Sequence, residues 1–148
     1  MRRPRRGRAR DLKVERLSRV QLFSACSKRD LSRIAVLTEE VEVPAGRVLM
    51  RQGDYGREAF VIADGRAKAT IRGKRSAKLG PGDCFGEMAL LHSAPRSATV
   101  TAESEMRLFV LSSREFSELI ESVPVVGRRV LAALAERLRE AERAQPQH

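Results

Sequence analysis

The residues best suited to chemistry lie in one short segment, residues 85–100. Gly86 has no Cβ and lets a ligand approach the backbone closely, and Glu87 follows it directly. Residues 88–91 are predicted to form one apolar helical turn, whose first amide groups would face outward and could bind an anion. Eight residues lie between Glu87 and Arg96. Because a guanidinium can hold a phosphate through two parallel hydrogen bonds and a carboxylate can accept from a sugar hydroxyl, the segment predicts a site for a phosphorylated sugar.

This segment resembles the phosphate-binding cassette of the cyclic nucleotide-binding domain family, which includes the regulatory subunits of cyclic-AMP-dependent protein kinase and the bacterial catabolite activator protein. The resemblance rests on the letters FGEMALL and PRSATV, with weaker similarity from about Leu17 to Arg139. It implies that Glu87 binds the ribose 2′-hydroxyl and Arg96 the cyclic phosphate, with the Ser97 hydroxyl near the phosphate or the base. Other residues would line the pocket through backbone groups: Gly86, Met88, Ala89 and Ala98.

Each residue of the pair also has a purely structural explanation. Glu87 could be a carboxylate at a helix start and Arg96 a surface arginine, but their combination in one segment favours a binding site. The choice of base depends on Ser97, whose hydroxyl could bond an amino group of guanine. Family members that prefer cyclic AMP often have alanine there, yet serine also occurs in bacterial relatives that bind cyclic AMP. We predict cyclic AMP as the ligand, with cyclic GMP as the alternative.

Two short helices are predicted ahead of this segment. Asp11 can cap a first helix that extends to residue 22, and Ser27, with Asp30 three residues on, can cap a second that ends at Leu37. Both carry apolar residues at helical spacing: Leu12, Leu17 and Val20 in the first, and Leu31, Ile34 and Leu37 in the second. The two are expected to pack on whatever follows.

Between residues 39 and 111 apolar residues recur at every second position in short runs separated by turns. Asp64-Gly65, between two such runs, is a strong hairpin signal. The alternating positions are Val41 and Val43; Val48 and Met50; Phe60 and Ile62; Ala67, Ala69 and Ile71; Ala77 and Leu79; Ala98, Val100 and Ala102; and Met106, Leu108 and Val110. Many short strands of this kind predict an α+β, mainly β fold: a jelly-roll β-barrel interrupted by the cassette and flanked by helices.

Helical spacing returns near residue 112. Ser112 or Ser113 can cap a helix over residues 114–122, and Pro124 fits the first turn of a last helix that reaches about Arg143. This last helix has an apolar stripe made of Val126, Val130, Leu134, Leu138 and Ala141. Because the stripe needs a surface to bury it, we expect this helix pair to pack on the strands and to cover the base of a bound nucleotide.

The chain is predicted to contain one domain between two tails. Residues 1–10 hold six arginines and no acid and are expected to be a disordered tail, residues 11–143 form a single cyclic nucleotide-binding domain, and residues 144–148 form a second tail. The domain would divide into N-terminal helices at 11–38, a jelly roll at 39–111 and C-terminal helices at 112–143. The net charge of +10 belongs mostly to the first tail, because without its six arginines 23 basic side chains face 19 acidic ones.

Several kinds of chemistry have no basis in the sequence. Only His92 and His148 occur, so no histidine pair can hold a metal, and Cys26 and Cys84 are isolated, without a CxxC motif. Neither a Ser/His/Asp triad nor a glycine-rich P-loop can be assembled. No apolar run approaches the ~20 residues of a membrane span, and no secretory signal is visible. We therefore predict a cytoplasmic protein that is neither an enzyme nor a metal binder.

Together these patterns predict a stand-alone cyclic nucleotide receptor that couples ligand capture to movement of its C-terminal helices and signals through a protein partner or a homodimer. In bacterial relatives a helix-turn-helix usually follows the long helix, but the chain ends at His148, and we expect no recognition helix. Two alternatives remain. One is a nucleic-acid-associated regulator that uses the Arg-rich tail, and the other is an interaction module that keeps the fold and binds no nucleotide.

Overall fold

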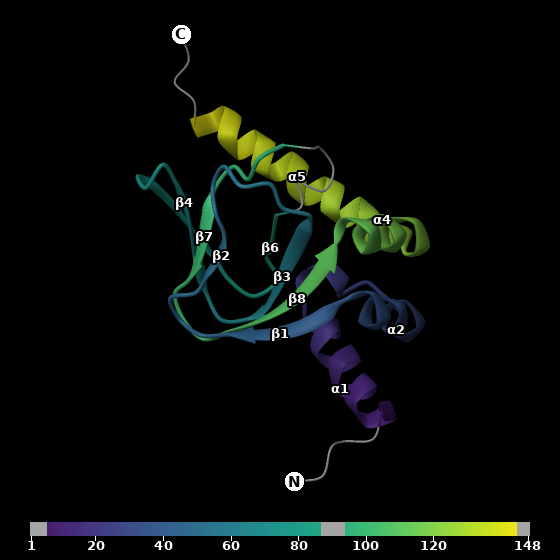
Figure 1. Ribbon diagram of the computed structural model, residues 1–148. Helices are drawn as coiled ribbons and strands as arrows, with labels where there is room; N and C mark the ends of the chain where they lie inside the picture. Colours follow the sequence, from purple (N-terminus) through teal and green to yellow (C-terminus); the bar gives the residue numbers. More distant parts are fainter. Residues whose placement is uncertain (1–5, 87–93, 145–148) are drawn as a thin grey trace.

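The computed structural model describes residues 6–86 and 94–144 of the 148-residue chain (Figure 1). Within these residues the strands form two four-stranded sheets, and every pairing is antiparallel. One sheet has the order β1 (Glu39–Val43), β8 (Met106–Ser112), β3 (Glu58–Asp64) and β6 (Cys84–Phe85). The other has the order β2 (Val48–Met50), β7 (Thr99–Ala102), β4 (Ala67–Ile71) and β5 (Arg75–Leu79).

The predicted jelly-roll class is confirmed, although the two sheets do not close into a barrel. The described strands pair only within their own sheet, so that β1 and β6 are the edges of one sheet and β2 and β5 the edges of the other. The chain crosses repeatedly from sheet to sheet, and two layers facing each other bury the apolar face of each strand without closure. The fold is therefore a sandwich of two sheets.

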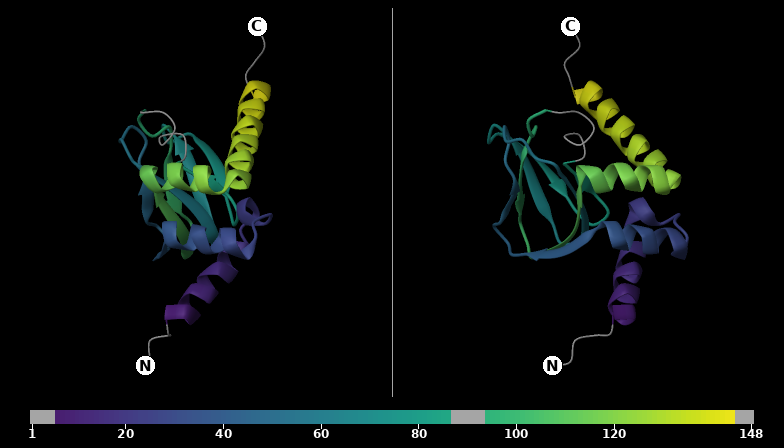
Figure 2. Two further views of the ribbon diagram at one scale, coloured as in Figure 1. Left: turned by 90° about the vertical axis from the view of Figure 1, so that its right-hand side faces the viewer. Right: turned by 45° about the vertical axis from the view of Figure 1, so that its right-hand side comes forward.

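Five helical segments flank the sandwich in the part of the chain that is described. They are α1 (Arg6–Ser18), the 3₁₀ helix η1 (Gln21–Phe23) and α2 (Lys28–Leu37) before the strands, and α4 (Ser113–Ser122) and α5 (Pro124–Ala144) after them. Figure 2 shows these helices gathered on one side of the sandwich, with α1 pointing away from the rest of the molecule.

The predicted start of the first helix is wrong. It begins at Arg6 and not at Asp11, so residues 6–10 of the expected disordered tail are helical, and it ends at Ser18 rather than at residue 22. Arginine is a good helix former, and a helix propagates cheaply once one part of it is held by tertiary packing. Here the fully buried Leu17 and the half-buried Val14 hold the second half of α1 against the core.

Two of the predicted helix caps, before α2 and before α4, are confirmed. Ser27 precedes α2 and its hydroxyl accepts a hydrogen bond from the backbone N–H of Asp30 at 3.1 Å. Of the two candidates before α4, Ser112 is the cap: it accepts from the N–H of Glu115 at 3.2 Å, and the Glu115 carboxylate accepts from the N–H of Ser112 at 2.9 Å. This reciprocal pair satisfies two donors that a helix start otherwise leaves without partners.

The core has two layers on opposite faces of the sheet that contains β3 and β8. Between the sheets lie side chains such as Phe60, Ile62 and Leu108. On the other face Val61 and Phe109 pack against the helices, together with Phe23, Ile34, Phe116 and Leu119. Neighbouring residues of a strand point to opposite faces, so β3 and β8 must be apolar at nearly every position when helices cover the second face. This explains the continuous runs AFVIA and LFVL.

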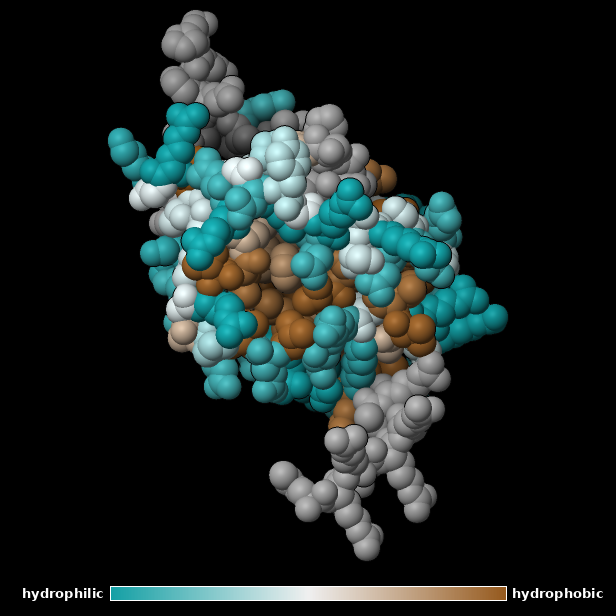
Figure 3. Space-filling view, in the orientation of Figure 1, coloured by the Kyte–Doolittle hydropathy of each residue, from teal (hydrophilic) through white to brown (hydrophobic). Residues whose placement is uncertain are grey.

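Apolar side chains also reach the surface between the two sheets. The space-filling view (Figure 3) shows them gathered near the centre, surrounded by hydrophilic residues. The hydrophobic residues that pack on the inner layer and are only partly buried are Val41, Leu49, Met50, Ala69 and Leu79. The sandwich is thus well filled but open along its edges.

Candidate functional site

Arg96 lies just before β7 and is held by the loop that follows β2. Its backbone N–H donates to the carbonyl of Asp54 at 2.8 Å, and its carbonyl accepts from the N–H of Gly53 at 2.9 Å. Since β2 and β7 are already paired, with Met50 opposite Val100, these two bonds continue the pairing beyond the strand ends. The position of Arg96 is therefore determined by the sheet and by a loop some forty residues earlier in the sequence.

The side chain of Arg96 is buried, with only 6% of the residue's surface exposed. Its Nη1 donates to the carbonyl of Gly86 at 3.0 Å and its Nη2 to the carbonyl of Glu58 at 2.9 Å. Burying a charged group is costly unless it is hydrogen-bonded or paired, so these carbonyls stabilise a guanidinium that the fold takes out of water. They also set the direction of its planar donor group.

Two glycines make room for this guanidinium. A Cβ on Gly56 would lie 2.3 Å from Nη2, 2.4 Å from Nε and 2.6 Å from Cζ of Arg96. A Cβ on Gly86 would lie 2.8 Å from Nη1 and 2.8 Å from the carbonyl oxygen of Glu58. Gly86 also has a φ of +83°, a backbone conformation that side chains other than glycine's disfavour. No larger residue fits at either position with Arg96 where it is.

An aromatic pair supports the Gly86 side of this arrangement. Phe60 on β3 stands opposite Phe85 on β6, and their rings stack with centroids 4.8 Å apart and an interplanar angle of 13°. Both side chains are buried in the layer between the sheets. The stack fixes the short strand β6, and thereby the carbonyl of Gly86 that Arg96 contacts.

A second set of hydrogen bonds connects the same loop to the β4–β5 hairpin. The N–H of Gln52 donates to Thr99 Oγ1 at 2.9 Å, and the Gln52 side-chain oxygen accepts from the N–H of Arg72 at 2.7 Å. Arg72 has a φ of +53°, as the hairpin turn requires. Gln52 therefore ties the hairpin, the loop and the strand that follows Arg96 into one unit.

The structure brings together some of the residues predicted for the site. Arg96 and Gly86 are in direct contact, Ala98 is buried two residues further on, and Ser97 is exposed between them. Three predicted residues, Glu87, Met88 and Ala89, lie outside the described residues, as does His92. Their assignments stay predictions.

The residues that hold Arg96 from the β2–β3 side could not be recognised in the sequence. Asp54 and Glu58 contribute only backbone carbonyls, which every residue type has. The φ of Gly56 lies outside the left-handed region, and the role of this glycine is to leave space for the guanidinium. A glycine that no turn geometry requires, two residues before a strand, was the available signal.

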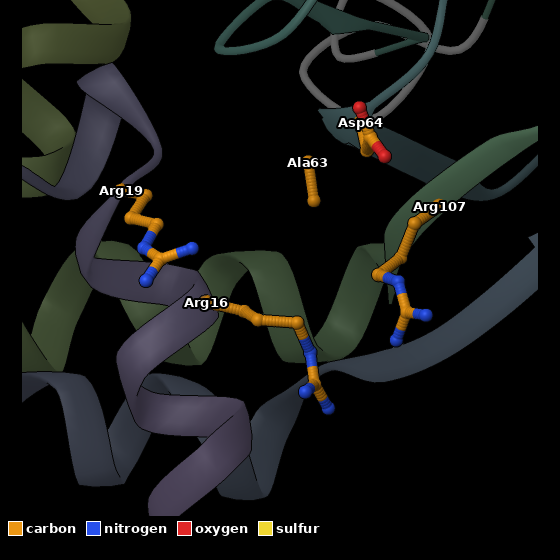
Figure 4. A pocket seen from close by; sticks show the side chains of 5 residues that line it. All are labelled: Arg16, Arg19, Ala63, Asp64 and Arg107. Atoms are coloured by element: carbon orange, nitrogen blue, oxygen red, sulfur yellow. The ribbon is translucent and has the colours of Figure 1, made fainter.

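A separate pocket of about 290 Å³ lies elsewhere and is lined by Arg16, Arg19, Ala63, Asp64 and Arg107 (Figure 4). Asp64 is at the opposite end of β3 from Glu58, about 20 Å away at ~3.3 Å per residue. Its arginines already face acids: Glu40 bridges Arg16 and Arg107, and Glu42 also pairs with Arg107. This pocket is therefore a poorer candidate for an anion-binding site than the surroundings of Arg96.

Residues 6–86 and 94–144 contain no group of three His, Cys, Asp or Glu side chains that could hold a metal ion. No helix in these ranges is long and apolar enough to cross a membrane. In the part of the chain that is described, neither Cys26 nor Cys84 forms a disulfide. The fold and the site thus define a domain of two packed sheets that buries Arg96 in a space left by Gly56 and Gly86.

Comparison with known proteins agrees with this description. The model of the cyclic nucleotide-binding domain matches residues 40–123. The chain is 40% identical over 109 residues to the Pycsar effector protein XpPycTIR of Xanthomonas perforans, covering 73% of this chain and 36% of that protein. It is 36% identical over 104 residues to the cyclic AMP receptor protein of Thermus thermophilus, covering 67% of this chain and 48% of that protein.

Solved structures show the same fold. The Thermus thermophilus catabolite activator protein superposes with a TM-score of 0.73 at 32% identity, over 82% of this chain and 59% of that one. Cyclic-AMP-bound PfPKA-R superposes with a TM-score of 0.76 at 25% identity, over 92% of this chain and 48% of that one. The chain belongs to the cyclic nucleotide-binding domain family. It spans less than half the length of the two curated relatives named above.

Proposed function

We propose that this chain binds a cyclic nucleotide, with cyclic AMP as the preferred ligand, and acts as a receptor rather than as an enzyme. The observation that carries the proposal is the buried guanidinium of Arg96, oriented by the carbonyls of Gly86 and Glu58 and enclosed by Gly56 and Gly86. Membership of the family and similarity to a cyclic AMP receptor protein support the choice of ligand.

In the proposed complex the cyclic phosphate lies against Arg96. A guanidinium offers two parallel N–H donors to a phosphate, and such charge-assisted bonds are about twice as strong as neutral ones. Because backbone carbonyls and glycines hold the arginine in place beforehand, little side-chain entropy is lost on binding. Glu87 would accept the ribose 2′-hydroxyl, and backbone groups of Gly86, Met88, Ala89 and Ala98 would line the rest, with Ser97 near the phosphate or base.

Binding needs no chemical step from these residues. A guanidinium such as that of Arg96 keeps its proton at any physiological pH, so it does not act as a proton carrier. A hydrolytic site would need metal ligands or a positioned base. The chemistry of the described residues thus favours capture of the nucleotide over its cleavage.

The captured ligand is proposed to act through the C-terminal helices. β8 runs directly into α4 through the Ser112 cap, and Val126 and Val130 of α5 are buried in the same core layer as Phe109 of β8. Ligand can shift the helices only by its difference in affinity for two arrangements. Hydrogen exchange with and without cyclic AMP tests this coupling, and unchanged protection over residues 126–143 at saturation contradicts it.

The decisive test of ligand binding replaces Arg96. Arg96→Ala removes one side of a buried charge-assisted contact, a change that costs about 2–5 kcal/mol, or about thirty- to several-thousand-fold in affinity. Arg96→Lys should also lose affinity for the nucleotide, because an ammonium cannot reproduce the planar donor pair. Glu87→Gln should weaken binding less, since an amide oxygen still accepts from a hydroxyl.

Calorimetry with cyclic AMP and cyclic GMP provides the measurement. The exposed Arg66, just beyond the end of β3 opposite Glu58, supplies the matched control, because Arg66→Ala removes the same charge away from the site. Unchanged affinity of a folded Arg96→Ala protein contradicts the assignment of Arg96. A wild-type protein that binds neither nucleotide contradicts the proposed function itself.

A further inference from the structure

Helix α1 carries a dense group of positive charges away from the domain. Its first residues, 6–10, include Arg6, Arg8 and Arg10. A helix rises 1.5 Å per residue, so these three arginines originate within about 6 Å of helix length. The ribbon views show this end of α1 pointing away from the sandwich (Figure 2). The preceding residues of the sequence add Arg2, Arg3 and Arg5.

The second half of the same helix is anchored to the domain. Lys13 Nζ donates to the carbonyl of Ala35 at 2.6 Å and also to the carbonyl of Thr38, at the end of α2. Burial lowers the pKa of Lys13, partly opposed by the charge of Glu40. Leu17 is fully buried in the core layer beneath the helices. These contacts tie α1 to α2.

An ion-pair cluster of Arg16, Glu40 and Arg107 ties α1 to the sheet as well. Arg16 donates from Nε to Glu40 Oε2 at 2.6 Å and from Nη2 to Oε1 at 2.5 Å, and Arg107 on β8 approaches the same carboxylate at 3.4 Å. The hydrogen bond to Glu40 raises the pKa of Arg16. Figure 4 shows the side chains of Arg16, from α1, and Arg107, from the sheet, converging. Glu40 on β1 therefore fixes the direction of the helix.

We propose that residues 6–10 of α1 form a rigid basic arm that binds the phosphate backbone of a nucleic acid. Arginine is suited to this partner because its planar donors match phosphate oxygens, and neutralising phosphates releases counterions. Because residues 6–10 continue an anchored helix, their backbone is already ordered, which reduces the ordering that binding must impose. The arm is thus part of the folded domain, not a free tail.

A membrane surface fits this arm less well. A helix that lies on a bilayer needs an apolar face to insert. Residues 6–10 offer only Ala9, and Val14 and Leu17 further along α1 already pack in the core of the domain. Leu12, 43% exposed, is the remaining large apolar residue of the helix. The composition favours contact with phosphates over insertion among lipid chains.

The proposal predicts binding of the full chain to a short fluorescein-labelled DNA duplex of mixed sequence. Fluorescence anisotropy at several salt concentrations should give a log–log slope of about −3 to −5, as three to six phosphate contacts require. Replacing Arg6, Arg8 and Arg10 together by glutamine should make the slope less negative by about three. Vesicles of phosphatidylserine and phosphatidylcholine provide the comparison. Binding to vesicles without binding to the duplex, or binding to neither, overturns the proposal.

A charge-neutral variant tests the rigidity of the arm. Leu12→Pro breaks the helix between the arginines and the anchored half, because proline clashes with the preceding turn and biases residue 11 away from helical geometry. Leu12 is 43% exposed and lies outside the core layer beneath the helices, so the melting temperature should change little. Duplex binding should weaken about fivefold. Equal affinity of the variant and the wild type overturns the rigid arm.

Glu40→Gln is the second variant, and it distinguishes the effect of net charge on duplex binding from the effect of anchoring α1. It removes one negative charge and so raises the net charge of the protein by one. Charge alone therefore predicts tighter binding to the duplex, whereas a loosened α1 predicts weaker binding. Glu118→Gln, on the exposed side of α4, makes the same charge change without touching α1. Weaker binding of Glu40→Gln than of Glu118→Gln supports the proposal, and equal or tighter binding overturns it.

Discussion

Replacing Gly56 by alanine should disable the nucleotide site without unfolding the domain. The new Cβ would lie 2.3–2.6 Å from three atoms of the Arg96 guanidinium, far inside contact distance. Gly56 itself does not have the positive φ that makes alanine a strained choice, so the backbone can keep its course. The guanidinium is the end of a flexible side chain, and it is this group that must move.

The magnitude follows from what Arg96 loses when it moves. Its bonds to the carbonyls of Gly86 and Glu58 involve a charged donor, and each such bond contributes about 1.5–3 kcal/mol. Water replaces part of this in a displaced arginine, so stability should fall by less than the sum. Affinity for cyclic AMP should fall by at least about thirtyfold, the lower end expected for losing a buried charged contact.

Calorimetry with cyclic AMP and a urea unfolding curve measure the two effects. Gly80→Ala is the matched control, because a Cβ there meets nothing within 4 Å and the backbone is not in the left-handed region. In an Arg96→Ala background Gly56→Ala should have no further effect on affinity, since both changes act on one contact. Retention of wild-type affinity by a folded Gly56→Ala protein refutes the reasoning.

Two further predictions concern stability and reactivity. Ser112→Ala removes the hydroxyl half of the capping box before α4 and should lower the free energy of unfolding by about 1 kcal/mol in urea titrations, whereas Ser117→Ala, on the exposed face of α4, should change it little. Burial, with a smaller effect of Asp30, raises the pKa of the Cys26 thiol, so less thiolate is present at pH 8 and iodoacetamide should alkylate it more slowly in the folded than in the urea-unfolded Cys84→Ser protein. Equal rates contradict the burial of Cys26.

The amino-acid sequence by itself determined the family, the fold class and most of the elements. Alternating apolar residues located seven of the eight described strands, because each strand has a core face and the side-chain period is two. Ser27, Ser112 and Pro124 marked helix starts correctly, since caps act over three or four residues and leave a local pattern. The two-residue strand β6 was missed because it is too short to show a period.

Only the tertiary structure decided how Arg96 is held and which faces are buried. The guanidinium depends on a carbonyl 38 residues earlier and on space left by Gly56, and neither a carbonyl nor a space is encoded in residue type. The run AFVIA likewise shows that both faces of β3 are buried but not that helices cover one of them. The length of α1 was decided in the same way, by the anchoring of Leu17 and Arg16 in contacts distant in sequence. Strand alternation and helix caps depend on residues close together in the sequence, whereas the site is formed by segments that only the packing of the sheets brings together.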